Sequence, residues 1–347
     1  MSKGPRRFGH VESVALIGGG DLMHQTAQIL RQSGLRTIIV LAPRHAEEFL
    51  PVAGGPAKKA FADDGSAVHV VQDINAWQEL ESADWAGANS LALCFGPPWI
   101  FDEHVLARFG AGMINFNGIP IPRYIGGAHY TWQILNGDRT GGCFLQEITM
   151  DVDRGPLLRR HLFDLPAGVR LPEDYFLANY EEGCRFMEQA IADMRADKEF
   201  EPIEFTSLDE SRLYYPRLNT LENGWIDWSW TALEIERFCC AFDRPYAGAA
   251  TLLGGAMVRL SDVRLTEPIE ALHPFVAGLV VRNIGQKASI AARDGLLTVT
   301  AARSEDGNDA MELLKEGRRL YTPPDRLSHA LTCRPALTAN GFLEKKR

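Results

Sequence analysis

Short apolar segments alternate with amphipathic ones along the first 200 residues, and this alternation limits the fold more than any other feature of the chain. The first unit is an apolar run over 13–17, a break at Gly18-Gly19-Gly20, and an amphipathic stretch over 22–33 with Asp21 as its expected N-cap. Further apolar runs stand at 37–41, 68–71, 90–95, 113–116 and 141–150. Strands that alternate with helices build a parallel sheet through right-handed crossovers, so the N-terminal part is predicted to be an α/β domain.

The second part of the chain has a different pattern. A helix predicted from Asp227 to about Phe242 precedes short alternating strands at 249–253, 257–265, 278–283, 287–292 and 296–302. Many short strands after one helix indicate a small β-barrel. A chain of 347 residues usually has more than one core. The predicted divisions are a catalytic domain over 11–200, a linker over 201–226, a barrel over 227–322 and a tail without regular structure over 323–347.

The composition argues against several classes of protein. A formal net charge of -9 repels phosphate backbones at long range, so nucleic acid is not the expected partner. The six cysteines have no metal-ligand spacing, so they are predicted to be reduced core thiols and no metal site is expected. Neither a signal peptide nor a membrane span is recognisable, and a cytoplasmic protein is therefore expected.

The segment Gly18-Gly19-Gly20-Asp21-Leu22-Met23 only partly matches a dinucleotide-binding loop. Such a loop needs a further glycine where this chain has Met23, and the second predicted strand ends without an acidic residue for a ribose. The segment is therefore interpreted as a tight strand-to-helix turn, whose helix N-terminus can hold a phosphate or carboxylate. A nicotinamide-dependent oxidoreductase stays as an alternative that depends on this loop alone.

The informative stretch runs from Ile114 to Leu158. Asn115 and Asn117 lie two residues apart in a predicted strand, so their side chains point to the same face. A loop rich in proline and glycine follows at the carboxyl end of that strand, which is where open α/β sheets bind ligands. Asn136-Gly137, Thr140-Gly141 and Asp153-Arg154-Gly155 come after it.

These residues resemble the signature of the 10-formyltetrahydrofolate-dependent formyltransferases, a family that includes methionyl-tRNA formyltransferase and the sugar-nucleotide N-formyltransferases. The matching positions, in order, are Asn115, Pro122, Arg123, Gly126, Gly137, Thr140-Gly141 and Asp153-Arg154-Gly155. The stretches 223–229 and 237–249 are similar to the entry of the family's C-terminal barrel. The resemblance implies a Rossmann-like domain followed by an OB-like barrel. It also implies transfer of a formyl group from 10-formyltetrahydrofolate to the amine of a small metabolite or amino-sugar nucleotide.

The resemblance also implies a catalytic set, with one departure from the family. Asn117 stands where the family has its histidine, while Asn115 and Asp153 keep the other two positions of the family triad. Formyl transfer places negative charge on the formyl oxygen and releases a proton from the amine. The amides of Asn115 and Asn117 are the predicted donors to that oxygen, and Asp153 is the predicted proton acceptor. His129, at the start of the next helix, is the candidate to replace the missing imidazole.

Ligand contacts follow from the same resemblance. A flat pteridine is expected in a slot between the segment 95–100 and the loop 149–153. The expected contacts are Phe95, Gly96, Pro97, Trp99, Ile100, Ile121, Pro122, Thr149, Met150 and Asp151. The acceptor is expected at Arg123, Tyr124 and Gly126. The segment 43–60 lacks the basic insertion of the tRNA-specific members, so a small amine is favoured over a tRNA.

Asn117 leaves alternatives open. The same fold could carry a different acyl or one-carbon transfer, or a hydrolytic reaction, or it could be a non-catalytic ligand-binding protein. Hydroxylamines, hydrazines and aromatic amines are neutral near pH 7, so they would need less help from a base. Asp153 also suits a turn, Asn115 and Asn117 suit backbone hydrogen bonding, and His129 suits a capping role. Homodimers are common among the sugar-modifying members, and a homodimer stays an open alternative.

Overall fold

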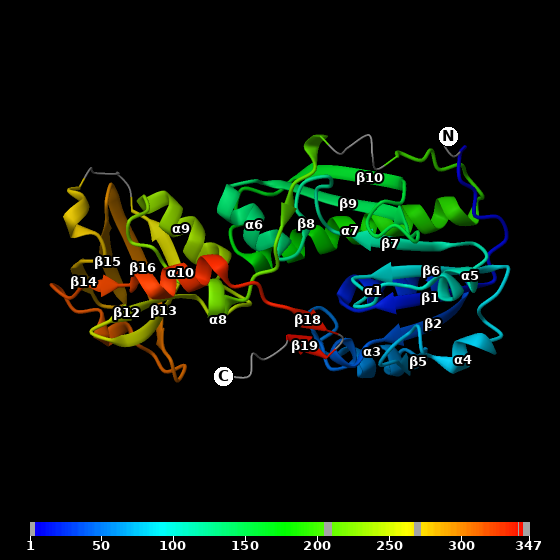
Figure 1. The fold of residues 1–347 in the computed structure, drawn as a ribbon, viewed down its shortest axis with the longest axis horizontal. Helices are drawn as coiled ribbons and strands as arrows, with labels where there is room; N and C mark the ends of the chain where they lie inside the picture. Colours follow the sequence, from blue (N-terminus) through cyan, green and yellow to red (C-terminus); the bar gives the residue numbers. More distant parts are fainter. Residues whose placement is uncertain (1–3, 205–209, 267–271, 339, 343–347) are drawn as a thin grey trace.

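The computed structural model describes residues 4–204, 210–266, 272–338 and 340–342. Figure 1 shows an elongated molecule with the N-terminal sheet at one end and the C-terminal strands at the other. Among these residues, no helix combines the length and the apolar character that crossing a membrane requires. The two parts are joined by the segment around β11 (Tyr214–Tyr215) and α8 (Thr220–Asn223).

A seven-stranded sheet forms the N-terminal domain, in the order β10-β9-β7-β6-β1-β2-β5. Its strands are β1 (Ser13–Gly18), β2 (Arg36–Leu41), β5 (Ala67–Val70), β6 (Ser90–Phe95), β7 (Met113–Asn117), β9 (Thr140–Glu147) and β10 (Leu157–Asp164). The five strands from β7 to β5 are parallel, as predicted. β9 and β10 are antiparallel, so the sheet is mixed at the edge that carries the central motif.

Helices cover both faces of this sheet. They are α1 (Asp21–Gln32), α2 (Pro43–Ala46), α3 (Ala57–Asp63), α4 (Gln78–Glu81), α5 (Glu103–Ala107), α6 (His129–Asn136) and α7 (Pro172–Arg195), with short strands β3 (Phe49–Leu50), β4 (Gly55–Pro56) and β8 (Ile125–Gly126) between them. Successive residues of β1 enter different cores: Val14 and Leu16 pack with one cluster, Ala15 and Ile17 with the other. A strand buried on both faces reads as a continuous apolar run, which is why this sheet was recognisable in the sequence.

The turn after β1 is built around glycine. A Cβ on Gly18 would lie 2.0 Å from the Phe95 carbonyl oxygen, so only glycine lets β1 and β6 approach there. The expected cap at Asp21 is wrong: the N-cap is Gly20 and makes no side-chain cap bond. The Asp21 carboxylate instead accepts the backbone N–H groups of Val52 and Ala53, both 3.0 Å away. A distant loop thus takes the acceptor that the helix terminus would otherwise use.

The C-terminal sheet has six antiparallel strands in the order β14-β15-β16-β13-β12-β17. They are β12 (Ala249–Leu253), β13 (Ala256–Leu265), β14 (Val280–Ile284), β15 (Lys287–Ala292), β16 (Gly295–Ser304) and β17 (Leu320–Tyr321). Backbone hydrogen bonds join Val280 to Arg318 and to Gly317, at 2.9 Å each, and these link the first and last strands. The predicted barrel is therefore a six-stranded antiparallel sheet. Its two ends are joined by a short isolated bridge between Leu279 and Arg319.

Two boundaries differ from the sequence prediction. The helix expected from Asp227 is α9 (Ala232–Ala241), and it begins later because Thr231 and Glu234 form a capping box. The tail contains α10 (Pro324–Thr332), β18 (Leu337–Thr338) and β19 (Gly341–Phe342), although no regular structure was predicted there. α10 packs beside α8, where the Asn223 side-chain amide donates to the carbonyls of Ala330 and Cys333.

Candidate active site

A cavity of about 430 Å³ opens beyond the ends of β6 and β7. Three segments meet there: the loop after β6, the end of β7, and the loop between β9 and β10. Its lining comprises Arg44, Gly96, Pro97, Pro98, Trp99, Ile100, Phe101, Asn115, Asn117, Gly126, His129, Gln146, Glu147, Ile148, Thr149, Val152, Asp153 and Arg217. The position at the carboxyl edge of parallel strands is the usual place for ligands in such sheets.

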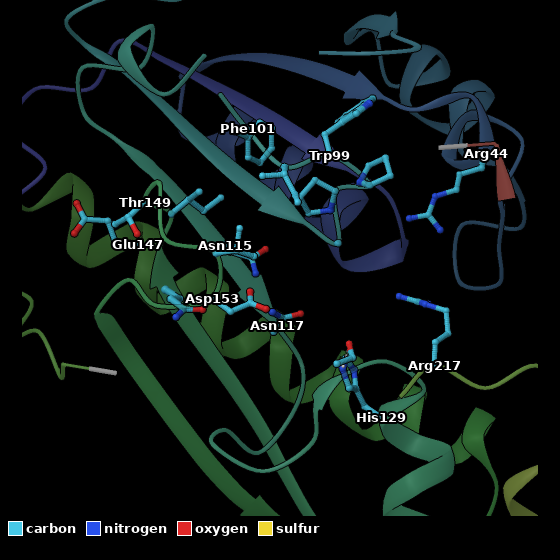
Figure 2. A pocket seen from close by; sticks show the side chains of 18 residues that line it. Arg44, Trp99, Phe101, Asn115, Asn117, His129, Glu147, Thr149, Asp153 and Arg217 are labelled. Carbon is cyan, nitrogen blue, oxygen red and sulfur yellow. Dashed lines mark hydrogen bonds between the residues drawn. The ribbon is translucent and has the colours of Figure 1, made fainter. Parts of the chain in front are cut away.

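All four predicted catalytic residues line this one cavity. Figure 2 shows Asn115, Asn117 and Asp153 close together on one side of it. The strand places Asn115 and Asn117 on the same face, and Asn115 pairs in register with Cys94 on β6 and Gln146 on β9. The Asn115 Oδ1 atom is buried and has no hydrogen-bond partner among the described residues. A buried acceptor without a partner is costly, which suits a site that a ligand completes.

Asp153 is exposed on the loop between β9 and β10, and its backbone is in the left-handed region at φ 56°. Glycine is required at the last position of the Asp-x-Gly motif, Gly155, for a steric reason. A Cβ on Gly155 would lie 1.8 Å from the Glu147 carbonyl oxygen, so the loop can fold back on the end of β9 only with glycine there. That close approach fixes where the Asp153 side chain emerges.

His129 begins α6 and borders the cavity next to Gly126. Its Nε2 atom lies 3.1 Å from the Gly126 carbonyl oxygen, which accepts a hydrogen bond when Nε2 carries the proton. Burial lowers the pKa of His129 from 6.5 to about 4; the bond to Gly126 opposes this, and the nearby Arg217 charge adds to it. The imidazole is therefore neutral at pH 7, and Nδ1 is left as a proton acceptor.

The loop after β6, residues 96–101, forms one wall of the cavity, and hydrogen bonds to Gln72 and Asn75 anchor it. The Asn75 side chain donates to the Ile100 carbonyl at 2.8 Å and accepts the Asp102 N–H at 3.0 Å. The Trp99 indole N–H donates to the Gln72 carbonyl at 3.1 Å, which fixes the ring at the edge of the cavity. These contacts anchor Gly96, Pro97, Trp99 and Ile100, all predicted for the pteridine, as one surface.

Several predicted ligand contacts lie outside the cavity lining. Phe95 is buried and stacks on Phe116, with ring centroids 5.6 Å apart. Ile121 packs in a small core with Ile119, Ile125, Phe144 and Leu157. Pro122, Met150 and Asp151 also do not border the cavity, although Thr149 does. Of the predicted pteridine contacts, the structure thus brings together Gly96, Pro97, Trp99, Ile100 and Thr149.

Arg123 and Tyr124, which were predicted to bind the acceptor, turn instead toward Asp138. The Tyr124 hydroxyl donates to Asp138 Oδ2 at 2.9 Å, and the Arg123 guanidinium lies 3.1 Å from the same atom. The Thr140 N–H donates to Asp138 Oδ1 at 2.9 Å. Burial raises the pKa of Asp138, but the hydrogen bonds from Thr140, Tyr124 and Arg123 outweigh it and hold the pKa below its usual value. Asp138 therefore joins the loop that carries Arg123 and Tyr124 to Thr140 at the start of β9. We call this set of contacts the Asp138 clamp.

Replacing Asp138 by alanine is expected to lower the free energy of unfolding by roughly 1–3 kcal/mol, because Thr140 and Tyr124 lose their acceptor. Since the folded-state pKa is depressed, this stabilisation is present above the usual value of 3.8 and is lost as the pH falls through the lower folded value. Urea titrations at pH 7 and in acid measure both effects. Arg123→Gln is the control, because an exposed ion pair contributes little. Equal losses in the two variants would contradict the clamp.

Several lining residues escaped the sequence reasoning, among them Gln146, Arg44 and Arg217. Gln146 is directly opposite Asn115 on β9, and its side-chain amide donates to the Gly155 carbonyl at 2.9 Å. Arg44 comes from α2, just after β2, and Arg217 comes from the linker. Pairing β9 against β7 would have identified Gln146. Arg217 has no such signal, because it reaches the cavity only through the pairing of β11 with β8.

The Gly18-Gly19-Gly20 loop does not border this cavity. A Cβ on Gly19 would lie 2.7 Å from Glu48 Oε2 and 2.9 Å from the His45 ring, so these side chains cover the loop. Burial raises the pKa of Glu48, while a hydrogen bond with the Gly20 backbone and the Arg44 charge lower it. The chain's own Glu48 carboxylate thus bonds to the Gly20 backbone at the start of α1, where an external anion would otherwise bind.

Residues 219–314 match the family described as "Formyl transferase, C-terminal domain". The methionyl-tRNA formyltransferase of Roseiflexus castenholzii is 29% identical over 203 residues, which are 58% of this chain and 61% of the relative. The enzyme of the same name from Treponema denticola is 28% identical over 195 residues, 56% of this chain and 58% of the relative. The matched segment thus spans about three-fifths of each of these relatives.

The fold is shared with solved formyltransferase structures. The sugar 3N-formyl transferase WlaRD has a TM-score of 0.61 at 14% identity, covering 86% of this chain and 99% of that chain. The N-formyltransferase from Helicobacter canadensis has a TM-score of 0.62 at 13% identity, covering 84% and 98%. HypX from Aquifex aeolicus has a TM-score of 0.52 at 14% identity, covering 96% and 51%. Residues 219–314 thus match a formyltransferase C-terminal domain, and the chain has the fold of solved formyltransferases.

Proposed function

We propose that the chain is an N-formyltransferase that moves a formyl group from 10-formyltetrahydrofolate to the amine of a small molecule. The observation that carries this proposal is the single cavity that Asn115, Asn117, Asp153 and His129 share. The donor is supported by neighbours of the same fold. WlaRD was crystallised with 5-N-formyl-THF, the Helicobacter canadensis protein with folinic acid and HypX with tetrahydrofolic acid.

The residues present fit a folate. A flat pteridine hydrogen-bonds along one edge, and the cavity is lined by the anchored wall at 96–101 and by Ile148 and Thr149. The unpartnered Asn115 Oδ1 atom gives a buried acceptor that a ligand N–H can satisfy. When bound, the folate would supply the activated formyl group. The chain itself supplies the side-chain amides of Asn115 and Asn117 to the same cavity.

The side-chain amides and the Asp153 carboxylate have different roles in the proposed reaction. Amide N–H groups of Asn115 and Asn117 can donate to the formyl oxygen as negative charge develops there, and preorganised donors of this kind are strong contributors to rate. Asp153 accepts the proton of the amine, directly or through water. We propose His129, which lines the same cavity, as a second proton acceptor in place of the histidine that the family has where this chain has Asn117.

A small amine is proposed as the acceptor, although the curated relatives carry the name methionyl-tRNA formyltransferase. The net charge of -9 opposes binding of a polyanion. The segment after β2 folds back as α2, the β3–β4 pair and α3, and Lys59 there is paired with Asp63. A gel-shift titration with total tRNA at physiological salt separates the two classes, because a tRNA enzyme would bind at micromolar protein.

Titration with folinic acid by calorimetry tests the donor site. We expect micromolar binding to the wild-type chain and at least tenfold weaker binding to Thr149→Trp, because the indole would fill the slot opposite the wall. Ile284→Trp is the control, since Ile284 is exposed on β14 in the other domain. No binding to the wild-type chain at millimolar folinic acid would overturn the proposal. It would favour a different acyl donor or a hydrolytic reaction on this fold, the alternative that Asn117 motivates.

A further inference from the structure

Two arginines from distant parts of the chain converge at one end of the cavity. Arg44 lies on α2 directly after β2, and Arg217 lies two residues beyond β11. Figure 2 shows both guanidinium groups turned into the same space beside His129, across from Asp153. Both arginines also line a second hollow of about 720 Å³, which continues past Asn219 toward Tyr246 of the C-terminal domain. The pair therefore stands where the two spaces meet.

The position of Arg217 is set by rigid neighbours. Tyr215 is stacked on Tyr124 with ring centroids 5.2 Å apart, and Trp132 lies 5.0 Å away on the same ring. The Trp132 indole N–H donates to the Pro216 carbonyl at 2.8 Å. A Cβ on Gly127 would lie 3.3 Å from Arg217 Cζ, so the guanidinium rests over the glycine backbone. An arginine held in this way loses little freedom when it binds a ligand.

Arg44 has one carboxylate near it, that of Glu48, which also lines the second hollow. Its Nε atom is buried and has no hydrogen-bond partner among the described residues. Burial lowers the pKa of Arg44, the charge of Arg217 lowers it further, and only Glu48 opposes this. The Glu48 carboxylate is itself engaged with the backbone of Gly20. The Arg44 guanidinium therefore has only a carboxylate that is already engaged elsewhere to offset the charge of Arg217.

Two like charges that face one space repel each other, and an anion between them reverses that cost. A planar guanidinium also matches the two oxygens of a carboxylate or phosphate. We infer that Arg44 and Arg217 bind an oxyanion group, a carboxylate or a phosphate, of the amine acceptor. The assignment of this anion to an acceptor rests on the proposed formyl transfer. The anion site itself rests on the geometry of the two arginines.

The glutamate carboxylates of a folate offer the same chemistry from another source. The arrangement favours the acceptor because the arginines lie beside His129 and open into the second hollow. Thr149, which suits the pteridine, lies on the other side of Asn115 from both arginines in Figure 2. An acceptor that enters from the second hollow would place its anion at the arginines and its amine toward Asn117 and Asp153.

The test is calorimetric titration of the full chain with inorganic phosphate and with acetate at constant ionic strength. The variants are Arg44→Gln, Arg217→Gln and, as the control, Arg160→Gln, which changes an exposed arginine on β10. We expect the preferred anion to bind about tenfold more weakly to each of the first two variants and unchanged to the control, because charge-assisted hydrogen bonds are lost. Preference between phosphate and acetate identifies the acceptor's anion. Equal binding of both anions to all four proteins would overturn the inference.

Folinic acid titrated into the same variants separates the two sources. Unchanged folinic acid affinity in Arg44→Gln and Arg217→Gln supports an acceptor anion. A loss that matches the loss of phosphate or acetate would overturn that assignment in favour of the folate glutamate. Because folinic acid binding by the wild-type chain is measured separately, failure of the donor site and failure of the anion site are distinguishable. Circular dichroism spectra of each variant show whether the fold is kept.

Discussion

Asp153→Asn is expected to lower kcat for formyl transfer by roughly 10²- to 10⁴-fold, the range that a positioned general base contributes. Asparagine keeps the size of the side chain and its loop position but cannot take a proton. Because Asp153 is exposed at the rim of the cavity, the fold should not depend on its charge. The assay uses a primary alkyl amine as the acceptor and follows release of tetrahydrofolate. Hydroxylamine, which is largely neutral at pH 7, should show a smaller loss because it needs less help from a base.

Asp151→Asn provides the matched control, since it is an exposed aspartate on the same loop that does not border the cavity. Folinic acid affinity should be the same in both variants and the wild-type chain. If Asp153→Asn keeps its rate while His129→Gln loses it, the proton acceptor is the imidazole. A rate that both single variants keep would mean that the amine needs no base from either residue.

Asn115→Ala is expected to reduce kcat by roughly 10²- to 10³-fold, which is the usual effect of removing one donor to a developing oxyanion. Asn115 lies on β7, which pairs with β6 and β9, and its side chain borders the cavity. Asn117→Ala should have a smaller effect if Asn117 is only a second donor. Initial rates with saturating folate and hydroxylamine measure kcat directly for each variant.

Asn89→Ala is the control for this series, because Asn89 is an exposed asparagine bonded to Glu12 on the far side of the sheet. An Asn115→Ala variant that kept its rate but lost folinic acid affinity would assign the residue to donor binding alone. Asn117→His, which restores the family's residue, should accelerate the reaction of an ordinary alkyl amine more than that of hydroxylamine. Equal acceleration of both would mean that acceptor basicity is not what the asparagine selects.

Local patterns in the chain were enough to predict the α/β domain and most of its strands. Residues 14–17 and 91–95 read as continuous apolar runs because each of these two strands is buried on both faces. The two-residue spacing of Asn115 and Asn117 placed both side chains on one face, and both line the cavity. These features depend on neighbours in sequence and on the period of a strand, so they can be read without the fold.

Contacts between distant segments decided the rest. Nothing near Arg123 or Tyr124 in sequence indicates that Asp138 would draw both away from the cavity. Arg217 is brought in by pairing of β11 with β8, and Glu48 takes the helix terminus that an external anion could have used. A hydrogen bond or a close approach between segments far apart in the chain leaves no periodic trace in either one. The sequence therefore determined which groups are available, and only the tertiary structure decided which of them face the cavity.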